Sequence, residues 1–281
     1  MAQASGSNTG KKLIRIDVSS DSVCPWCFVG KKNLDKAIAA SKDQFDFEIK
    51  WHPFFLNPSA PKEGVNKRQF YESKFGSRAQ GILSRMTEIF RGLGMEYDLS
   101  GLTGNTLDSH RLIYFAGTQG LDKQHNLVEE LFLGYFTQGK YIGDREFLVE
   151  CAKKVGVEGA AEFLENPDNG LKEVYEDLQK YSANISGVPN YIVELKIEDS
   201  DLQSERELKI KVDVDLIMSK DASIEPNIEP IVSATGEFGN SIITIATGES
   251  GDRDEADVQK IVLLMTKQVP LMLMTNQVPV L

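Results

Sequence analysis

Two cysteines, Cys24 and Cys27, lie between a predicted strand and a predicted helix, and this junction constrains the fold more than any other feature. Residues 13–18 (Leu-Ile-Arg-Ile-Asp-Val) alternate apolar and polar side chains, which is typical of a strand. Residues 31–40 carry apolar side chains at helical spacing. Pro25 suits the first turn of this helix, because the N–H that proline lacks has no partner there. The sequence therefore predicts a tight strand-to-helix turn that carries both sulfur atoms.

The position of the two cysteines also predicts their chemistry. The unpaired N–H groups and the positive dipole end of a helix favour thiolate over thiol at Cys24. Cys27 returns to the same face one turn later, within reach of a mixed disulfide formed at Cys24. We therefore interpret Cys24, at the exposed start of the helix, as an attacking thiolate and Cys27 as the resolving thiol. This is the arrangement that dithiol–disulfide exchange requires.

A structural zinc half-site is the alternative interpretation of such a cysteine pair. Zinc usually needs four protein ligands, so a second pair of cysteines or histidines should be present. The one other cysteine is Cys151, and His52, His110 and His125 are scattered without ligand spacing. The sequence thus favours redox chemistry and predicts no metal. Cys151, on a predicted helix, is expected to be a buried small hydrophobe.

Helical spacing dominates the middle of the chain. Residues 45–51 predict a second strand, which completes a βαβ unit with a right-handed crossover. A loop follows at residues 59–66, and strand character resumes at residues 191–197 after a long helical block. The helices of this block are expected at residues 69–93, 106–118, from 122 onward, from the N-cap Asp144 to 155, at 159–165 and at 170–181.

The composition changes near residue 190. Of the 24 aromatic residues only Tyr191 and Phe238 lie in the last 92 positions, which carry 8 Lys or Arg against 17 Asp or Glu. A segment with so few large anchors buries little apolar area against the entropy of ordering it. We therefore expect residues 199–281 to be a divergent, acidic and poorly ordered tail, with short strands at 208–217 and 241–247.

The N-terminus and the net charge bear on location and partners. Residues 1–11 are polar and Gly/Ser-rich, so we expect a disordered N-terminus without the apolar core of a secretory signal. The sequence has no uninterrupted run of 18 apolar residues, so we predict no membrane-spanning helix. The net charge of −11 argues against nucleic-acid binding. These features predict a cytoplasmic protein with neither a membrane nor a nucleic acid as partner.

Four motifs taken together resemble the DsbA-like thioredoxin-fold oxidoreductases, specifically the FrnE-type branch of bacteria and plants. They are Asp21-x-x-Cys-Pro-Trp-Cys27, Pro53-Phe-Phe-Leu-Asn-Pro58, Asn105-Thr-x-x-x-His110-Arg111-Leu112 and Gly187-Val-Pro189. The resemblance implies an α/β domain over residues 12–198. In it, residues 12–58 and 185–198 form a thioredoxin fold, and residues 66–182 form a large all-helical insertion. After Val193 the sequence departs from the family pattern, which continues with a Gly-turned hairpin and a final helix.

The same resemblance implies further site residues. The proline that matches Pro189 is cis and faces the cysteine pair in this family, so the backbone of Val188 could pair with an extended substrate. Pro25 and Trp26 would set the exposure and poise of the pair, although Trp26 could equally shield apolar surface. Candidate cleft residues are Asp21, Asn57, Asn105, His110 and Arg111. Turn bonds for Asp21 and Asn57, and an ordinary helix-face role for His110, remain the alternatives.

We therefore predict a thiol–disulfide oxidoreductase that acts on a thiol- or disulfide-containing protein or on glutathione. No cofactor is expected, and glutathione is a candidate co-substrate. Two other functions stay open at this point. Glutathione-dependent isomerases of the 2-hydroxychromene-2-carboxylate isomerase type share the helical insertion, but they typically carry Ser where Cys24 stands and lack the second cysteine. The second alternative is a truncated thioredoxin-fold module without catalytic activity.

Overall fold

A strand–helix–strand unit at the N-terminus forms the start of the sheet. This computed structural model describes residues 11–199, 204–213, 234–238 and 241–245. The predicted βαβ unit is present as β1 (Lys12–Ser20), α1 (Pro25–Ser41) and β2 (Phe45–Pro53). The alternation in β1 buries Ile14, Ile16 and Val18, and β1 pairs in parallel with β2 along its whole length. The βαβ start of the predicted α/β thioredoxin fold is therefore confirmed.

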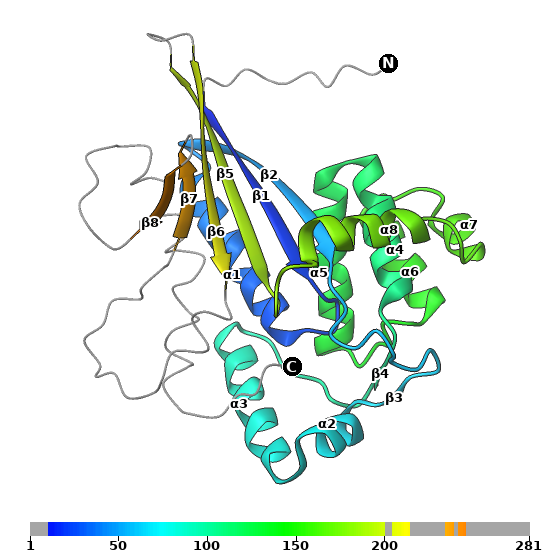
Figure 1. Cartoon of the computed structure of the whole chain (residues 1–281). Coiled ribbons are helices and arrows are strands. Elements are labelled where there is room, and N and C mark those ends of the chain that lie inside the picture. Colours follow the sequence, from blue (N-terminus) through cyan, green and yellow to red (C-terminus); the bar gives the residue numbers. More distant parts are fainter. Residues whose placement is uncertain (1–10, 200–203, 214–233, 239–240, 246–281) are drawn as a thin grey trace.

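The sheet continues beyond β1 with four antiparallel strands, in the order β2-β1-β5-β6-β7-β8 (Figure 1). They are β5 (Asn190–Asp199), β6 (Ser204–Asp213), β7 (Ala234–Phe238) and β8 (Ser241–Ile245). The strands predicted at 208–217 and 241–247 correspond to β6 and β8, and β7 was not predicted. Because β6 pairs with β5 over all ten residues, the sheet is closed on that side beside the start of β5. The expected disorder of residues 1–11 and of the tail falls largely outside the described residues.

The helical insertion lies between β2 and β5 in the sequence, and Figure 1 shows most of it gathered beside the β2 edge of the sheet. Asp144 caps α6 as predicted, since its side chain accepts a hydrogen bond from the Glu146 N–H at 3.0 Å. The elements of the insertion are β3 (Val65–Asn66), α2 (Lys67–Phe75), η1 (Gly76–Arg78), α3 (Ala79–Gly92), β4 (Leu102–Thr103), α4 (Leu107–Gln119), α5 (Leu121–Thr137), α6 (Arg145–Lys154), α7 (Ala160–Glu165), α8 (Leu171–Asp177) and η2 (Leu178–Ser182).

One predicted helix of the insertion is in fact two. The apolar spacing over residues 69–93 predicted a continuous helix, but α2 ends at Phe75 and α3 begins at Ala79. Gly76 between them has φ 55°, in the left-handed region that glycine adopts without steric cost. The prediction was wrong because apolar periodicity persists across a tight helix break and therefore does not reveal it.

An aromatic cluster joins α1 to the insertion. The ring of Phe28 in α1 lies 5.7 Å from Phe90, 5.2 Å from Phe132 and 5.8 Å from Phe136, measured between ring centroids. Phe28, Phe90 and Phe136 have no exposed surface, and Phe132 is 1% exposed. Aromatic side chains bury large areas, so this cluster fixes the insertion against the helix that carries the cysteines.

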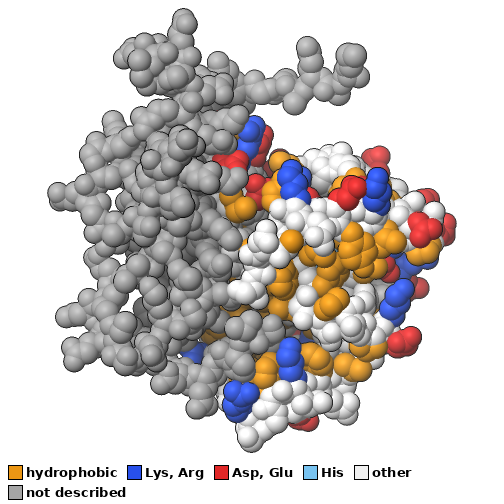
Figure 2. All heavy atoms as spheres, viewed as in Figure 1, with side chains coloured by type: hydrophobic (Ala, Val, Ile, Leu, Met, Phe, Trp, Pro, Cys, Tyr) orange, Lys and Arg blue, Asp and Glu red, His pale blue; other side chains and the backbone are white. Residues whose placement is uncertain are grey.

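The outer face of the insertion mixes apolar and charged side chains. Figure 2 shows acidic and basic groups interspersed around apolar side chains on the described part of the molecule. Single exposed apolar residues, such as Tyr175 at 47%, are normal on protein surfaces. Within the described part of the chain, no helix has the length and apolar character needed to cross a membrane.

We predict that Phe28→Ala lowers the free energy of unfolding by about 3–5 kcal/mol, because it opens a cavity among rings that cannot collapse into it. Urea unfolding monitored by circular dichroism measures the change. Tyr175→Ala, on the exposed side of α8, serves as the control and should cost less than about 1 kcal/mol. Equal losses for the two variants would contradict the role given to the cluster.

Candidate functional site

The cysteine turn has the geometry that the sequence predicts. Cys24 is the N-cap of α1 with extended backbone angles (φ −86°, ψ 113°), and Pro25 opens the helix. The Cys24 N–H donates to the Asp21 carbonyl at 3.0 Å, and the Cys27 N–H donates to the Cys24 carbonyl at 3.1 Å. Trp26 points into the hydrophobic core, with 7% of its surface exposed. The turn therefore places both sulfur atoms at the first turn of α1.

Both sulfur atoms are buried, and the expectation that Cys24 is exposed was wrong. Cys24 is 1% exposed and Cys27 is fully buried. Burial raises the pKa of Tyr71 to about 12, and its electrostatic interaction with Cys24 adds to this rise. Tyr71 belongs to the insertion, so residues distant in the sequence surround the cysteine. A helix-start motif alone does not reveal such a covering.

The two thiols of the motif have different environments. Burial raises the pKa of Cys27 well above its ordinary value, and its hydrogen bond with Cys24 and the Cys24 charge raise it further. The Ser20 hydroxyl and the Asp21 backbone act in the opposite direction, but their effect is smaller. Cys27 therefore remains a thiol at neutral pH. Cys151 is fully buried in the insertion with its pKa raised to about 12 by burial, which confirms its role as a small hydrophobe.

The cis-proline loop faces the cysteine pair. The Val188–Pro189 peptide bond is cis, as the resemblance implied, and the Val188 carbonyl accepts a hydrogen bond from Cys24 Sγ at 3.6 Å. Val188 itself packs against the hydrophobic core. This loop therefore presents a backbone carbonyl to the sulfur at the start of α1.

A glycine in α1 lets the loop approach. A Cβ atom on Gly30 would lie 2.2 Å from the hydroxyl oxygen of Tyr191 and 3.0 Å from Cγ of Pro189. Burial raises the pKa of Tyr191, and electrostatic interaction with Cys27 and Cys24 raises it further. The sequence analysis missed Gly30 and Tyr191. The available signal was a glycine inside a predicted helix, where it costs stability unless close packing requires it.

Asp21 and His110 meet behind the cysteine turn. Asp21 is 1% exposed, and its Oδ2 accepts a hydrogen bond from the Leu56 N–H at 2.8 Å. Its Oδ1 lies 3.5 Å from Nε2 of His110, which itself lies 3.1 Å from the Phe54 carbonyl. The structure thus brings together two candidate residues that are far apart in the sequence.

The other three candidate residues bond mainly to the backbone of nearby turns. Asn57 is exposed and accepts from the Ser59 N–H, while Asn105 accepts from the Leu107 N–H and donates to the Ala60 carbonyl. Arg111 is 1% exposed; it pairs with Asp108 at 2.7 Å and donates to carbonyls of residues 163, 166 and 169. These contacts hold turns of the insertion in place.

The insertion also contains a cluster of buried polar side chains that the sequence analysis did not predict. The hydroxyls of Tyr71 and Tyr97 lie 3.1 Å apart, and Tyr135 donates to the Thr103 hydroxyl at 2.7 Å. Lys67 donates to the carbonyls of Asp98 and Tyr135, and burial lowers its pKa to about 8. Tyr71, Tyr135 and Thr103 line a small pocket that also contains Val23, the residue before Cys24. The pocket therefore adjoins the cysteine turn.

Among residues 11–199 and the described strands of the tail, no group of three or more His, Cys, Asp or Glu side chains is placed to hold a metal ion.

We predict that Gly30→Ala destabilises the protein by about 1–3 kcal/mol, because the new methyl group overlaps the Tyr191 hydroxyl and presses on Pro189. Gly81→Ala in α3 is the matched control: no atom lies within 4 Å of its Cβ position, so a gain of about 0.5–1 kcal/mol is expected. Thermal unfolding measures both. Adding Tyr191→Phe to Gly30→Ala should restore part of the loss, and a stabilising Gly30→Ala would refute the packing argument.

Comparisons with known proteins agree with this geometry. The pattern of the DSBA-like thioredoxin domain matches residues 15–208. The uncharacterized protein YwbO of Bacillus subtilis is 26% identical over 193 residues, which cover 64% of this chain and 86% of YwbO. A probable DsbA oxidoreductase from Streptomyces coelicolor superposes with a TM-score of 0.57 at 27% identity, over 64% of this chain and 80% of that one.

A more distant structure shares the fold. A putative protein disulfide isomerase from Nitrosomonas europaea gives a TM-score of 0.51 at 13% identity and covers 92% of this chain and 99% of its own. The domain match spans more than half of the chain and includes both the cysteine turn and the cis-proline loop. The chain therefore belongs to the family of DSBA-like thioredoxin domains.

Proposed function

We propose that this protein catalyses thiol–disulfide exchange through Cys24 and Cys27. One observation carries the proposal: both cysteines lie on the first turn of α1, with the Val188 carbonyl of the cis-proline loop 3.6 Å from Cys24 Sγ. Membership of a family of DsbA-like disulfide oxidoreductases supports it. The finer placement in the FrnE-type branch and the cytoplasmic location rest on the sequence and belong to the same proposal.

The environments of the two sulfurs support different roles. Cys24 is at the helix N-terminus, where the positive end of the helix dipole favours a negative charge, and its sulfur lies beside the Val188 carbonyl of the cis-proline loop. Cys27 is one turn inside the helix, and burial holds it as a thiol. Cys24 therefore attacks the substrate disulfide, and Cys27 resolves the mixed disulfide by attacking Cys24 Sγ.

The burial of Cys24 bears on the partner. With 1% of Cys24 exposed, a substrate reaches its sulfur only after neighbouring groups move. A small disulfide requires less movement than a protein segment does. Among the two partners that the sequence suggests, a glutathione-sized disulfide therefore fits this site better than a protein disulfide.

We predict that the purified protein exchanges with glutathione disulfide and that Cys24→Ser abolishes this reaction, because it removes the attacking sulfur. Cys27→Ser should stop the reaction at a protein carrying one glutathione on Cys24, since no second thiol resolves it. Mass spectrometry of the intact protein measures both outcomes. Cys151→Ala, which removes a buried thiol remote from the turn, should behave like the wild type.

The same variants separate the alternative functions. If the wild type and Cys24→Ser behave alike and an aromatic substrate is isomerised in the presence of glutathione, the protein is a glutathione-dependent isomerase. If neither reaction occurs, it is a non-catalytic module. Either result would overturn the proposal.

We also predict that iodoacetamide modifies Cys24 well before Cys27. Because the pKa of Cys27 is raised well above its ordinary value, little of this thiol is ionised even at about pH 9, and its alkylation stays slow. Peptide mapping after timed alkylation between pH 6 and pH 10 gives both rates. Equal rates for the two cysteines would contradict the assigned roles.

A further inference from the structure

The carboxylate of Asp21 is buried, and one of its two oxygens accepts no hydrogen bond from the described part of the chain. Asp21 is 1% exposed, and the Leu56 N–H satisfies its Oδ2. No group in the described part of the chain donates a hydrogen bond to its Oδ1, although Nε2 of His110 lies 3.5 Å away. Burying a carboxylate without its full set of hydrogen bonds is costly, so this arrangement calls for an explanation beyond packing.

The charged groups nearby are engaged elsewhere. Arg111, next to His110 in α4, pairs with Asp108. His52 lies between Asp17 and Asp177, at 2.6 and 2.7 Å. Lys67 donates to two backbone carbonyls. Tyr135 donates to the Thr103 hydroxyl, and the charge of Asp21 adds to the rise that burial causes in the pKa of Tyr135. The facing partner of the Asp21 carboxylate is therefore His110.

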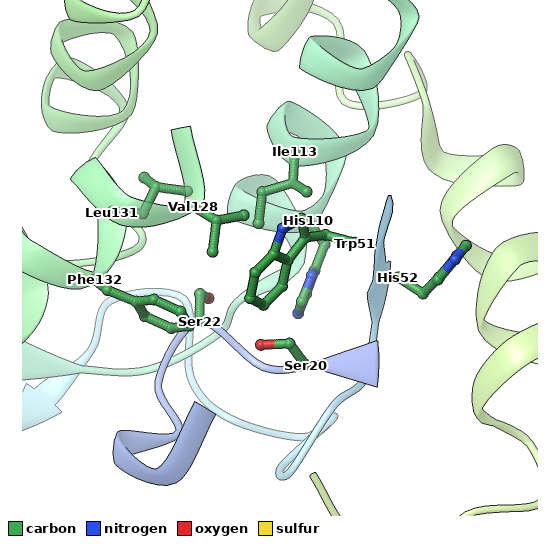
Figure 3. A pocket seen from close by; sticks show the side chains of 9 residues that line it. All are labelled: Ser20, Ser22, Trp51, His52, His110, Ile113, Val128, Leu131 and Phe132. Atoms are coloured by element: carbon green, nitrogen blue, oxygen red, sulfur yellow. The ribbon is translucent and has the colours of Figure 1, made fainter. Parts of the chain in front are cut away.

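A polar path connects this pair with Cys27. The Ser20 hydroxyl and the Asp21 backbone are both hydrogen-bonding neighbours of the Cys27 sulfur. Ser20, Ser22 and His110 all line one small cavity of about 10 Å³, roughly the space of one water molecule. Figure 3 shows the His110 ring reaching down from α4 toward the side of this cavity where Ser20 and Ser22 lie. Its other lining residues are Trp51, Ile113, Val128, Leu131, Phe132 and His52, and Figure 3 shows the His52 side chain directed away from the others.

We propose that Asp21 and His110 form a buried pair that accepts the proton of the Cys27 thiol when Cys27 attacks the mixed disulfide, by way of the Ser20 hydroxyl and the adjoining cavity. This inference deepens the proposed function and rests on it. It gives His110, which is contributed by the insertion, a task in the chemistry of the thioredoxin part. Both residues act on Cys27 through other groups and are positioning residues.

The step balances without any further reactant. The Cys24 thiolate attacks a disulfide R–S–S–R′, forming Cys24–S–S–R and releasing R′S⁻. The proton of the Cys27 thiol then passes to the Asp21–His110 pair while the Cys27 sulfur bonds to Cys24 Sγ and RS⁻ leaves. The products are the Cys24–Cys27 disulfide and two thiolates, and the proton is held by the pair. In the reverse direction the pair returns this proton to Cys27.

The two sulfur steps can be followed separately with Ellman's reagent, in a Cys151→Ala background. Attack by Cys24 releases a first coloured thiolate at a rate that depends on reagent concentration. Attack by Cys27 on the resulting mixed disulfide releases a second one at a rate that does not. Asp21→Asn keeps an oxygen for the Leu56 N–H but removes the charge, so we expect the second step to slow about 10- to 100-fold at neutral pH. The first step should change less than about twofold.

A pH profile distinguishes proton transfer from a structural effect. The deficit of Asp21→Asn in the second step should shrink as the pH rises toward 10, because hydroxide then removes the proton of Cys27. His110→Gln, which keeps a donor for the Phe54 carbonyl, should show the same deficit, and the double variant should be no slower than either single variant. His125→Gln is the matched control: His125 forms a comparable pair with Asp35 at 2.8 Å, does not line this cavity, and reaches it only through the hydrogen bond from the Trp51 indole.

The outcomes test the proton-acceptor role of Asp21 and His110 separately from the proposed exchange activity. An unchanged second step in either folded variant would overturn the proton-acceptor role, and so would a deficit that does not vary with pH or that His125→Gln reproduces. If Asp21→Asn does not fold, His110→Gln alone decides. If the wild type releases no coloured thiolate that depends on Cys24, the proposed exchange activity itself fails. If instead both steps are normal in the Asp21→Asn and His110→Gln variants, the exchange activity stands and only the proton-acceptor role fails.

Discussion

The close packing of the first two turns of α1 is the constraint on which the other parts of this protein depend. Cys24 and Cys27 occupy the start of the helix, Phe28 enters the aromatic cluster of the insertion, and Gly30 leaves room for Tyr191. One short segment therefore contacts the cis-proline loop on one side and the helical block on another. Because protein interiors are packed as densely as crystals, a shift of any one partner is transmitted to the sulfur atoms.

Charged groups further along α1 set the position of the insertion. Lys31 is 2% exposed on its side chain and lies 2.9 Å from Asp35 and 3.0 Å from Glu129 of α5. His125 of α5 accepts a hydrogen bond at Nδ1 from the Trp51 indole of β2, so its Nε2 carries the proton and donates to Asp35. Burial raises the pKa of Asp35, but the bond from His125 and the charge of Lys31 lower it more. These contacts connect α1, α5 and β2 through one partly buried network of charged and polar side chains.

Local features of this chain could be predicted from the sequence, and long-range contacts could not. The strand-to-helix turn, the N-cap at Asp144 and the βαβ unit follow from residue spacing and residue type within continuous segments, and the cis Val188–Pro189 bond followed from the resemblance. The burial of Cys24, the fit of Tyr191 against Gly30 and the meeting of Asp21 with His110 depend on how distant elements pack. The break at Gly76 was missed for a different reason, because the apolar spacing on its two sides is alike.

The segment Asn105 to Arg111 shows how one motif can serve two purposes. Successive residues of a helix point about 100° apart, so His110 and Arg111 of α4 cannot face the same neighbours. His110 lies toward Phe54 and Asp21 behind the cysteine turn, whereas Arg111 binds Asp108 and the carbonyls of the turn at residues 163–169. The arginine and Asn105 hold α4 at a fixed height and rotation, and this placement decides where the histidine ring lies. A motif of this kind is needed as a unit because the positioning of its polar ring depends on the anchoring of its neighbours.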